Sequence, residues 1–142
     1  MNYKNNYEKW LNAENLDKTL KTELIALTDD EIIERFSTPL AFGTGGLRGP
    51  MGVGISRLNV HTIMQAAAGF AAYLKKHFNE GVVVISYDNR KDSKRFAEKS
   101  ALVLASYGLH AKVFESLRPT PMLSYAVRHF NAIGGIMITA SH

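Results

Sequence analysis

Gly134-Gly-Ile-Met-Ile-Thr-Ala-Ser-His142 is the stretch that decides the fold, and the chain ends with it. The apolar run predicts a buried strand over residues 132–140 that gives way to polar residues. In an open α/β sheet the ligand crevice lies beyond the carboxyl ends of the strands, so the Ser141 hydroxyl is well placed to act as a nucleophile. A serine at a strand end is also commonly a cap or turn residue, and on the residues alone both interpretations stay open. His142 can carry a proton or bind phosphate, but neighbours in an extended chain point to opposite sides, so a direct Ser–His pair is not expected.

Strands and helices are predicted to alternate upstream of this stretch. Val82-Val-Val-Ile-Ser86 is a continuous β-branched run, typical of a strand covered on both faces. The other predicted elements are a helix over 60–77 capped by Asn59 or Ser56, a helix over 93–107 capped by Ser93 or Asp92 and followed by Gly108, a strand over 110–114, and a helix over 122–130 behind Pro119 and Pro121. This order predicts an α/β fold, a three-layer α/β/α domain over residues 41–142 with a mostly parallel (mixed) four-stranded sheet.

The first 40 residues have a different character. Apolar residues recur at helical spacing over residues 3–27, with a break expected at 12–15. Thr28-Asp-Asp-Glu31 predicts a capping box that opens a short helix ending at Phe36. We interpret residues 1–40 as an N-terminal helical arm packed on the main body, without a core of its own.

Composition sets the broad class. The chain has 142 residues, is 46% hydrophobic and 21% charged, and has no cysteine, which is typical of an ordinary globular protein of the cytoplasm. No apolar stretch approaches the ~20 residues that cross a bilayer, so we expect no membrane partner. Residues 41–142 hold twelve Lys/Arg and five Asp/Glu, a charge of +7 that suits anionic ligands. Aromatic residues do not alternate with the arginines, so we expect no nucleic-acid partner.

The segment Phe42–Gly54 holds six of the eleven glycines. It lacks the Gly-Lys-Ser/Thr of a P-loop. Its backbone amides, at Gly45 and Gly46 among others, are unhindered by side chains, and Thr44 and Arg48 accompany them, so the segment can approach a phosphoryl group closely. The alternative is a glycine-rich hairpin that turns the chain into the sheet.

Two other loops are expected at the carboxyl ends of the strands. In Tyr87-Asp-Asn-Arg90, Arg90 can bind phosphate or an adjoining loop, and Asp88 can hold Arg90 or Arg48. A solvated turn is the alternative. Arg118-Pro-Thr-Pro121 predicts a rigid connection that places the next helix, because proline fixes φ.

Together these segments resemble the first domain of the α-D-phosphohexomutases, the phosphoglucomutase and phosphomannomutase superfamily. The arm, with Tyr7-Glu-Lys-Trp10, is similar to that of bacterial members on the branch related to phosphopentomutases. The family usually continues Thr-Ala-Ser-His with Asn-Pro, which is absent here. The resemblance is carried, in family order, by Phe42-Gly-Thr-Gly-Gly-Leu-Arg-Gly49, Tyr87-Asp-Asn-Arg90, Arg118-Pro-Thr-Pro121 and Gly135-Ile-Met-Ile-Thr-Ala-Ser-His142.

The resemblance implies an isomerase that transfers phosphate within a sugar. Ser141 is expected to be a phosphoserine that donates its phosphoryl group to a hexose phosphate, forms a hexose bisphosphate and is rephosphorylated. Arg48 is then expected to hold the phosphoserine, with His142 as hydrogen-bond donor or proton carrier. Thr44, Gly45, Gly46 and Arg90 are expected to bind substrate or phosphate.

The resemblance also implies parts that follow His142 in the family. These are an Asp-rich loop that holds Mg²⁺, a sugar-recognition loop and a phosphate clamp, so this chain offers the metal only Ser141, through its phosphate. The remaining domains of the same enzyme are the expected partners, and the chain alone is expected to be inactive. Glucose phosphate is the expected substrate. Mannose or pentose phosphate, or a non-catalytic phosphate-binding or interaction domain, are the alternatives.

Overall fold

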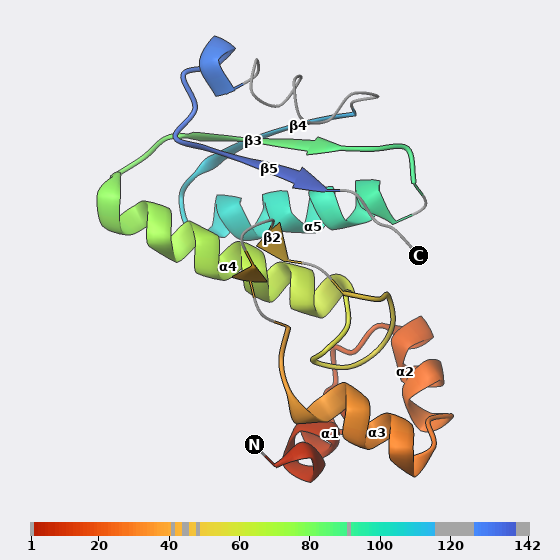
Figure 1. The fold of residues 1–142 in the computed structure, drawn as a ribbon. Helices are drawn as coiled ribbons and strands as arrows, with labels where there is room; N and C mark the ends of the chain where they lie inside the picture. Colours follow the sequence, from red (N-terminus) through yellow and green to blue (C-terminus); the bar gives the residue numbers. More distant parts are fainter. Residues whose placement is uncertain are drawn as a thin grey trace. The chain divides into compact units, whose positions relative to one another are not determined.

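The computed structural model describes residues 2–40, 42–43, 46–47, 49–90, 92–115 and 127–138 (Figure 1). The chain divides into two compact units, residues 1–62 and 63–141. The elements are α1 (Tyr3–Leu11), α2 (Lys18–Ile25), α3 (Asp29–Ser37), β1 (Phe42–Gly43), β2 (Gly46–Leu47), α4 (Val60–His77), β3 (Val82–Tyr87), α5 (Ser93–Ser106), β4 (His110–Glu115) and β5 (Gly134–Ile138).

The first unit begins with three short helices whose N-termini are capped by side chains. Asn2 accepts hydrogen bonds from the amides of Lys4 and Asn5, and Asp17 accepts one from Leu20. The break predicted at residues 12–15 is confirmed, since α1 ends at Leu11 and α2 begins at Lys18. Polar caps therefore fix where each helix starts, because the first amides of a helix have no partner within it.

The capping box predicted at Thr28 is also confirmed. The Glu31 amide donates to the Thr28 hydroxyl at 3.3 Å, and the Thr28 amide donates to the Glu31 carboxylate at 3.0 Å. The hydrogen bond from the Thr28 backbone, followed by the one from its hydroxyl, lowers the pKa of the Glu31 carboxyl. A charged Glu31 at the start of α3 is also favoured by the helix dipole.

The first unit has a hydrophobic core that the N-terminal helices share with residues beyond the arm, and the division at residue 40 stays a prediction. Leu24, Phe36 and Val53 are fully buried at its centre. The rings of Tyr7 and Trp10 meet that of Phe36 edge to face, with centroids 5.6 and 5.7 Å away. Partly buried around this centre are Tyr3, Tyr7, Trp10, Leu11, Leu16, Leu20, Leu27, Ile32 and Ile55. The core includes two residues from beyond the arm, and the pattern of the arm alone did not predict them.

The glycine-rich segment begins with a hairpin. Strands β1 and β2 pair antiparallel, Phe42 with Leu47 and Gly43 with Gly46. The hairpin interpretation of this segment is therefore confirmed for its backbone. Phosphate binding by this segment stays a prediction beside the hairpin.

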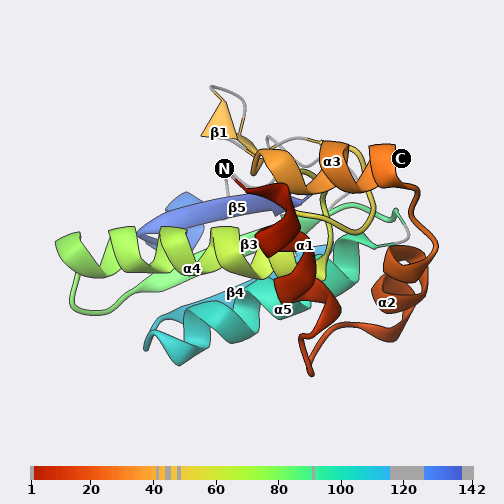
Figure 2. The ribbon, with the colours of Figure 1, turned by 90° about the horizontal axis from the view of Figure 1, so that it is seen from below.

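The second unit is built on a parallel sheet of order β4-β3-β5 (Figure 1). In the central strand β3, Val83, Val84, Ile85 and Ser86 are fully buried. The β-branched run is thus covered on both faces, as predicted. Helices α4, over residues 63–77, and α5 lie on the same face of this sheet (Figures 1 and 2). Gly134 lets α4 approach β5, because a Cβ there would lie 2.9 Å from a ring carbon of Phe70.

The fold class is confirmed at the level of an α/β domain with a parallel sheet, flanking helices and N-terminal helices. Within the described residues the parallel sheet has three strands, and β1–β2 form a separate sheet. A fourth strand in the parallel sheet and a helical layer on its other face stay predictions. Of the helix predicted over 122–130 only Val127–His129 are described as helical, and the loop Arg118–Pro121 lies outside the described residues.

The boundaries of the elements follow local signals closely. Helix α4 covers the predicted residues 60–77, and Gly108 follows α5 with a φ of 83°, the left-handed conformation that glycine adopts readily. Strand β5 begins two residues later than predicted, where the Ala132 amide instead closes a turn on the Val127 carbonyl at 2.9 Å. Among the described residues no helix is both long and apolar enough to span a bilayer.

Replacing Gly134 with alanine should lower the free energy of unfolding by about 1–3 kcal/mol, because the new methyl group would overlap Phe70. Gly69→Ala is the matched control. Gly69 lies in α4 with no atom within 4 Å of the added carbon, so this change should raise stability by about 0.5–1 kcal/mol. Urea denaturation of both variants measures the difference. A Gly134→Ala protein as stable as the native chain would contradict the close approach of α4 to β5.

Candidate active site

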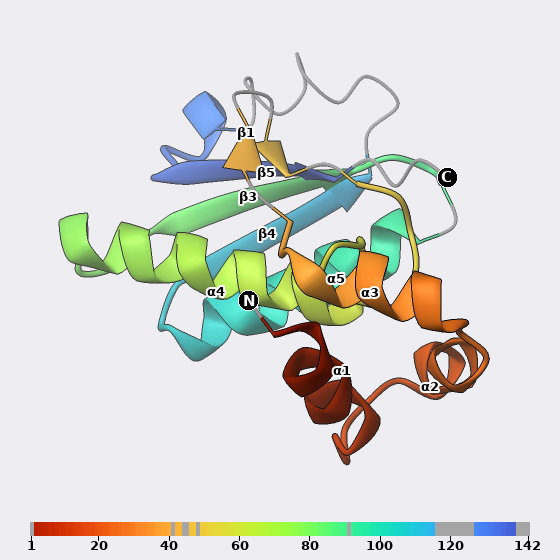
Figure 3. The same cartoon turned by 60° about the horizontal axis from the view of Figure 1, so that its bottom comes forward.

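The three parallel strands end together at one edge of the sheet. In the register of the sheet Tyr87, the last residue of β3, lies beside Glu115 of β4 and Ile138 of β5. The arrows in Figure 3 run in the same direction toward this edge. Residues 88–90, 116–121 and 139–142 follow these strand ends in sequence. The carboxyl edge of a parallel sheet is where α/β proteins bind ligands, so this edge is the candidate site.

Asp88 organises the part of this edge that follows β3. Its backbone amide donates to the carbonyl of Ile138, 3.2 Å away, and so ties the turn to the end of β5. Its carboxylate accepts hydrogen bonds from the Arg90 amide at 3.1 Å and from the Ser93 hydroxyl at 2.5 Å. The Arg90 side chain pairs with the other carboxylate oxygen, with Nε 3.4 Å from it. The hypothesis that Asp88 holds Arg90 fits this geometry.

The start of α5 differs from the simplest capping prediction. Asp92 occupies the N-cap position, but its side chain makes no capping hydrogen bond. Ser93, fully buried at the first position of the helix, donates its hydroxyl to Asp88 instead. One carboxylate thus joins the end of β3 to the start of α5, and the turn is not a loosely solvated loop.

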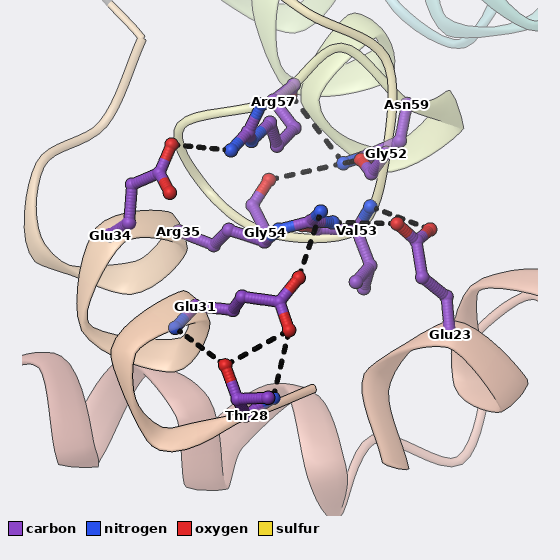
Figure 4. Close-up of polar contacts among 10 residues, drawn as sticks. All are labelled: Glu23, Thr28, Glu31, Glu34, Arg35, Gly52, Val53, Gly54, Arg57 and Asn59. Atoms are coloured by element: carbon purple, nitrogen blue, oxygen red, sulfur yellow. Dashed lines mark hydrogen bonds and ion pairs between the residues drawn. The ribbon is translucent and has the colours of Figure 1, made fainter. Parts of the chain in front are cut away.

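The segment that follows Arg48 is closed by Asn59, the predicted cap of α4 (Figure 4). The Asn59 side-chain oxygen accepts hydrogen bonds from the amides of His61 and Thr62, both at 3.0 Å. Its NH₂ group donates backward to the carbonyls of Gly52 at 2.9 Å and Gly54 at 3.1 Å. The buried Asn59 side chain therefore both caps the N-terminus of α4 and binds the backbone of the preceding loop.

Two further residues hold this segment, and sequence reasoning missed both. Glu23 of α2 accepts a hydrogen bond from the Val53 amide at 3.0 Å, and Arg35 of α3 donates to the Val53 carbonyl at 3.3 Å. Glu23 and Arg35 are themselves paired at 2.6 Å. They stand twelve residues apart on different helices, and no motif or helical spacing relates them to the glycine-rich segment.

Only part of the predicted site falls on described residues. Arg90 lies at the carboxyl edge, half exposed and paired with Asp88. Gly46 lies in β2, paired with Gly43. Thr44, Gly45, Arg48, Ser141 and His142 lie outside the described residues, so their roles stay predictions.

The described residues include no group of three or more His, Cys, Asp or Glu side chains that could hold a metal ion. Asp88, the carboxylate at the candidate edge, is already engaged by Arg90 and Ser93. Mg²⁺ needs several oxygen ligands in near-octahedral geometry. These described residues therefore do not fit a magnesium site by themselves.

The fold and the strand-end site define an α/β domain of the class that binds its ligand at the carboxyl edge of a parallel sheet. A family model described as "Phosphoglucomutase/phosphomannomutase, alpha/beta/alpha domain I" matches residues 39–142. The chain therefore belongs to this family and contains its domain I. The family that the motifs suggested is confirmed.

Curated relatives agree with this family. The chain is 46% identical to a phosphoglucomutase of Staphylococcus epidermidis over 115 residues, 81% of this chain and 21% of that protein. It is 41% identical to the phosphoglucomutase of Staphylococcus saprophyticus over 134 residues, 94% of this chain and 24% of that protein. The Staphylococcus aureus protein of the same name is 42% identical over 135 residues, 95% of this chain and 24% of that protein. No solved structure matches the chain significantly.

The chain thus spans between 21% and 24% of the length of these relatives. The match to the S. saprophyticus and S. aureus proteins covers nearly the whole chain, so it includes most of the N-terminal helices. The family model begins only at residue 39. Most of the arm is therefore shared with these two relatives, although it lies outside the region that the family model matches.

Replacing Asp88 with alanine should loosen the strand-end turn, because the Ser93 hydroxyl and Arg90 amide lose their acceptor. We expect the free energy of unfolding to fall by about 1–3 kcal/mol, with faster hydrogen exchange over residues 88–93. Asp92→Ala removes a nearby carboxylate that makes no capping bond, so it should have little effect. Urea denaturation and exchange mass spectrometry measure both. Equal behaviour of the two variants would contradict the organising role of Asp88.

Proposed function

We propose that this chain is the catalytic-serine domain of a phosphoglucomutase that interconverts glucose 1-phosphate and glucose 6-phosphate. The observation that carries the proposal is the match of residues 39–142 to domain I, whose last strand runs to the carboxyl edge of the sheet and leads into Ser141. Names of relatives that cover nearly all of the chain support the choice of glucose. Mannose or pentose phosphate remain the alternative substrates within the family.

The proposed reaction moves a phosphoryl group in two transfers through Ser141. In the first, the bond between phosphorus and the Ser141 oxygen breaks, and a bond forms to the 6-hydroxyl oxygen of glucose 1-phosphate. The product is glucose 1,6-bisphosphate, and the hydroxyl proton leaves through His142 or water. After the bisphosphate turns around, its phosphate at carbon 1 returns to Ser141 and leaves glucose 6-phosphate. No phosphate is gained or lost over the cycle.

Positive charge and backbone amides are proposed to hold the phosphate groups. Arg48 holds the phosphoserine, because a guanidinium matches the geometry of phosphate oxygens. Thr44 and the amides of Gly45 and Gly46 are proposed to bind phosphate at the hairpin, in which Gly43 pairs with Gly46. Arg90, in the turn after β3, is proposed to bind substrate or phosphate, and its pairing with Asp88 favours a role in supporting that loop.

The complete enzyme is proposed to need more than this chain. Mg²⁺, when bound, offsets the charge of the phosphoserine and stabilises phosphoryl transfer. Of the residues here only Ser141 would touch it, through its phosphate, and the main ligands come from the remaining domains. Residues 1–40 form the arm, and 41–142 form the three-layer domain with four strands. Sugar phosphates are charged metabolites that do not cross membranes freely, so the proposed reaction belongs to carbohydrate metabolism in the cytoplasm.

Substitution of Ser141 tests the proposal in a complete enzyme, in which residues 1–142 replace the matching part of the S. saprophyticus phosphoglucomutase. Ser141→Ala should lower turnover of glucose 1-phosphate roughly a thousandfold or more, because no covalent carrier remains. Ser106→Ala is the matched control, since Ser106 is exposed on α5, and it should keep full activity. An undiminished rate for Ser141→Ala would refute the proposal.

The chain alone is predicted to have negligible mutase activity, because it lacks the proposed metal and sugar sites. A coupled assay that converts glucose 6-phosphate to a coloured product measures this directly. The complete enzyme at the same concentration is the positive control. Robust turnover by residues 1–142 would show that the missing domains are not required.

A further inference from the structure

The N-terminal helices hold the glycine-rich segment by a specific polar contact as well as by apolar packing. We infer that Glu23 and Arg35 are positioning residues of the active site, which fix the segment immediately after Arg48. The inference rests on the proposed function, because Arg48 acts on phosphate only there. It gives the arm a part in catalysis that the family domain, which begins at residue 39, does not include.

The contact engages both backbone groups of one buried residue (Figure 4). The Val53 amide donates to Glu23 Oε1 at 3.0 Å, and the Val53 carbonyl accepts from Arg35 Nη1 at 3.3 Å. Glu23 Oε2 and Arg35 Nη1 lie 2.6 Å apart. Val53 is fully buried, so without these two side chains its amide and carbonyl would be desolvated and unpaired. The pair therefore provides the hydrogen-bond acceptor and donor that a neighbouring strand would provide in a sheet.

The backbone on either side of Val53 has little freedom to move. Gly52 and Gly54 have φ values of 141° and 124°, which other residues rarely adopt. A Cβ at Gly54 would lie 2.7 Å from Arg35 Cβ and 2.8 Å from the Arg35 carbonyl oxygen. The segment thus lies directly against α3, and only glycine permits this distance.

Further hydrogen bonds continue the same attachment along α3. The Ser56 amide donates to the Arg35 carbonyl at 3.2 Å, and the Arg57 side chain pairs with Glu34 at 2.6 Å. Asn59 also binds this segment, through the carbonyls of Gly52 and Gly54. The segment is therefore held by side chains of α2 and α3 and by the residue that caps α4.

The held segment is continuous with the position of Arg48. The Leu58 amide donates to the Pro50 carbonyl at 2.8 Å, and Met51 forms a bridge with Leu58. Gly49, one residue after Arg48, packs against the Leu40 side chain, since an added Cβ there would lie 2.6 Å from Leu40 Cδ2. A group that stabilises a transferring phosphate must be placed to within a fraction of an ångström. We therefore infer that the position of residues 49–59 limits the positions that the Arg48 guanidinium can take.

A purely stabilising role explains this pair less well. Leu24, Phe36 and Val53 already bury the apolar contact between the helices and the segment. The ion pair itself is only partly buried, with 14% of the Arg35 side chain and 36% of the Glu23 side chain exposed, and ion pairs near the surface add little stability. The pair instead fixes the orientation of the Val53 backbone. Hydrogen bonds to a carboxylate and a guanidinium require one orientation of the Val53 amide and carbonyl, whereas apolar contacts are compatible with many.

The kinetic test uses the complete enzyme defined above. Glu23→Ala should lower kcat about 10- to 100-fold, with KM for glucose 1-phosphate within about twofold of its native value. Glu23→Gln keeps an oxygen that can accept the Val53 amide, so it should recover most of the lost rate. Glu14→Ala is the matched control, since Glu14 is exposed before α2, and it should leave kcat and KM unchanged.

A second variant covers the case in which Glu23→Ala does not fold. Arg35→Lys keeps the charge, but an ammonium lacks the planar fork that serves Glu23 and Val53 together, so kcat should fall similarly. Hydrogen exchange of residues 1–142 supplies a readout without activity. Peptides covering 49–58 should exchange at least about tenfold faster in both variants, and peptides of α5 should not change.

The outcomes separate this inference from the proposed function. If Ser141→Ala is inactive while folded Glu23→Ala and Arg35→Lys both keep the native kcat, the inference is wrong and the proposed function stands. If peptides covering 49–58 exchange faster in the variants while kcat stays native, the inference is also wrong, and the role of the pair is structural only. If Ser141→Ala stays active, or the unsubstituted enzyme has no mutase activity, the proposed function fails and the catalytic inference falls with it.

Discussion

The parallel pairing of β3 with strands on both its sides is the constraint on which the second unit depends. Because both neighbours run in the same direction as β3, all three carboxyl ends reach one edge. Parallel neighbours cannot be joined by a tight turn, so the chain returns through helices such as α5 between strands. The segments that follow β3, β4 and β5 in sequence therefore all begin at this edge. Asp88 then joins two of these strand ends through a backbone bond to Ile138 and side-chain bonds to Arg90 and Ser93.

The first unit solves a different physical problem, which is how to order the glycine-rich residues that follow the β1–β2 hairpin. Glycine loses more conformational freedom on folding than any other residue, so such a segment is ordered only if other groups hold it. Here Asn59, Glu23 and Arg35 bind its backbone carbonyls and amides directly. Helices α2 and α3 therefore form a scaffold for the residues from Val53 to Arg57, and the core of the helices includes Val53.

Local signals predicted the elements well. The β-branched run at Val82, the capping box at Thr28 and the cap at Asn59 each rest on neighbours in sequence, and each is confirmed. The contacts of Glu23 and Arg35 with Val53 span 30 and 18 residues and follow no periodic pattern, so sequence reasoning could not find them. The second core was missed for a similar reason, since two of its members lie in or beside the glycine-rich stretch. The motifs identified the family, while the roles of Arg48, Ser141 and His142 depend on residues outside those described.

The central claim is that the oxygen of Ser141 carries the transferred phosphoryl group. Tandem mass spectrometry of the complete enzyme, after incubation with glucose 1,6-bisphosphate and removal of free sugar, tests it most directly. The account predicts one phosphoryl group, located on Ser141 and lost when excess glucose 6-phosphate and glucose 1-phosphate are supplied without bisphosphate. An enzyme that turns over with Ser141 unmodified, or with its phosphate on another residue, would contradict the account.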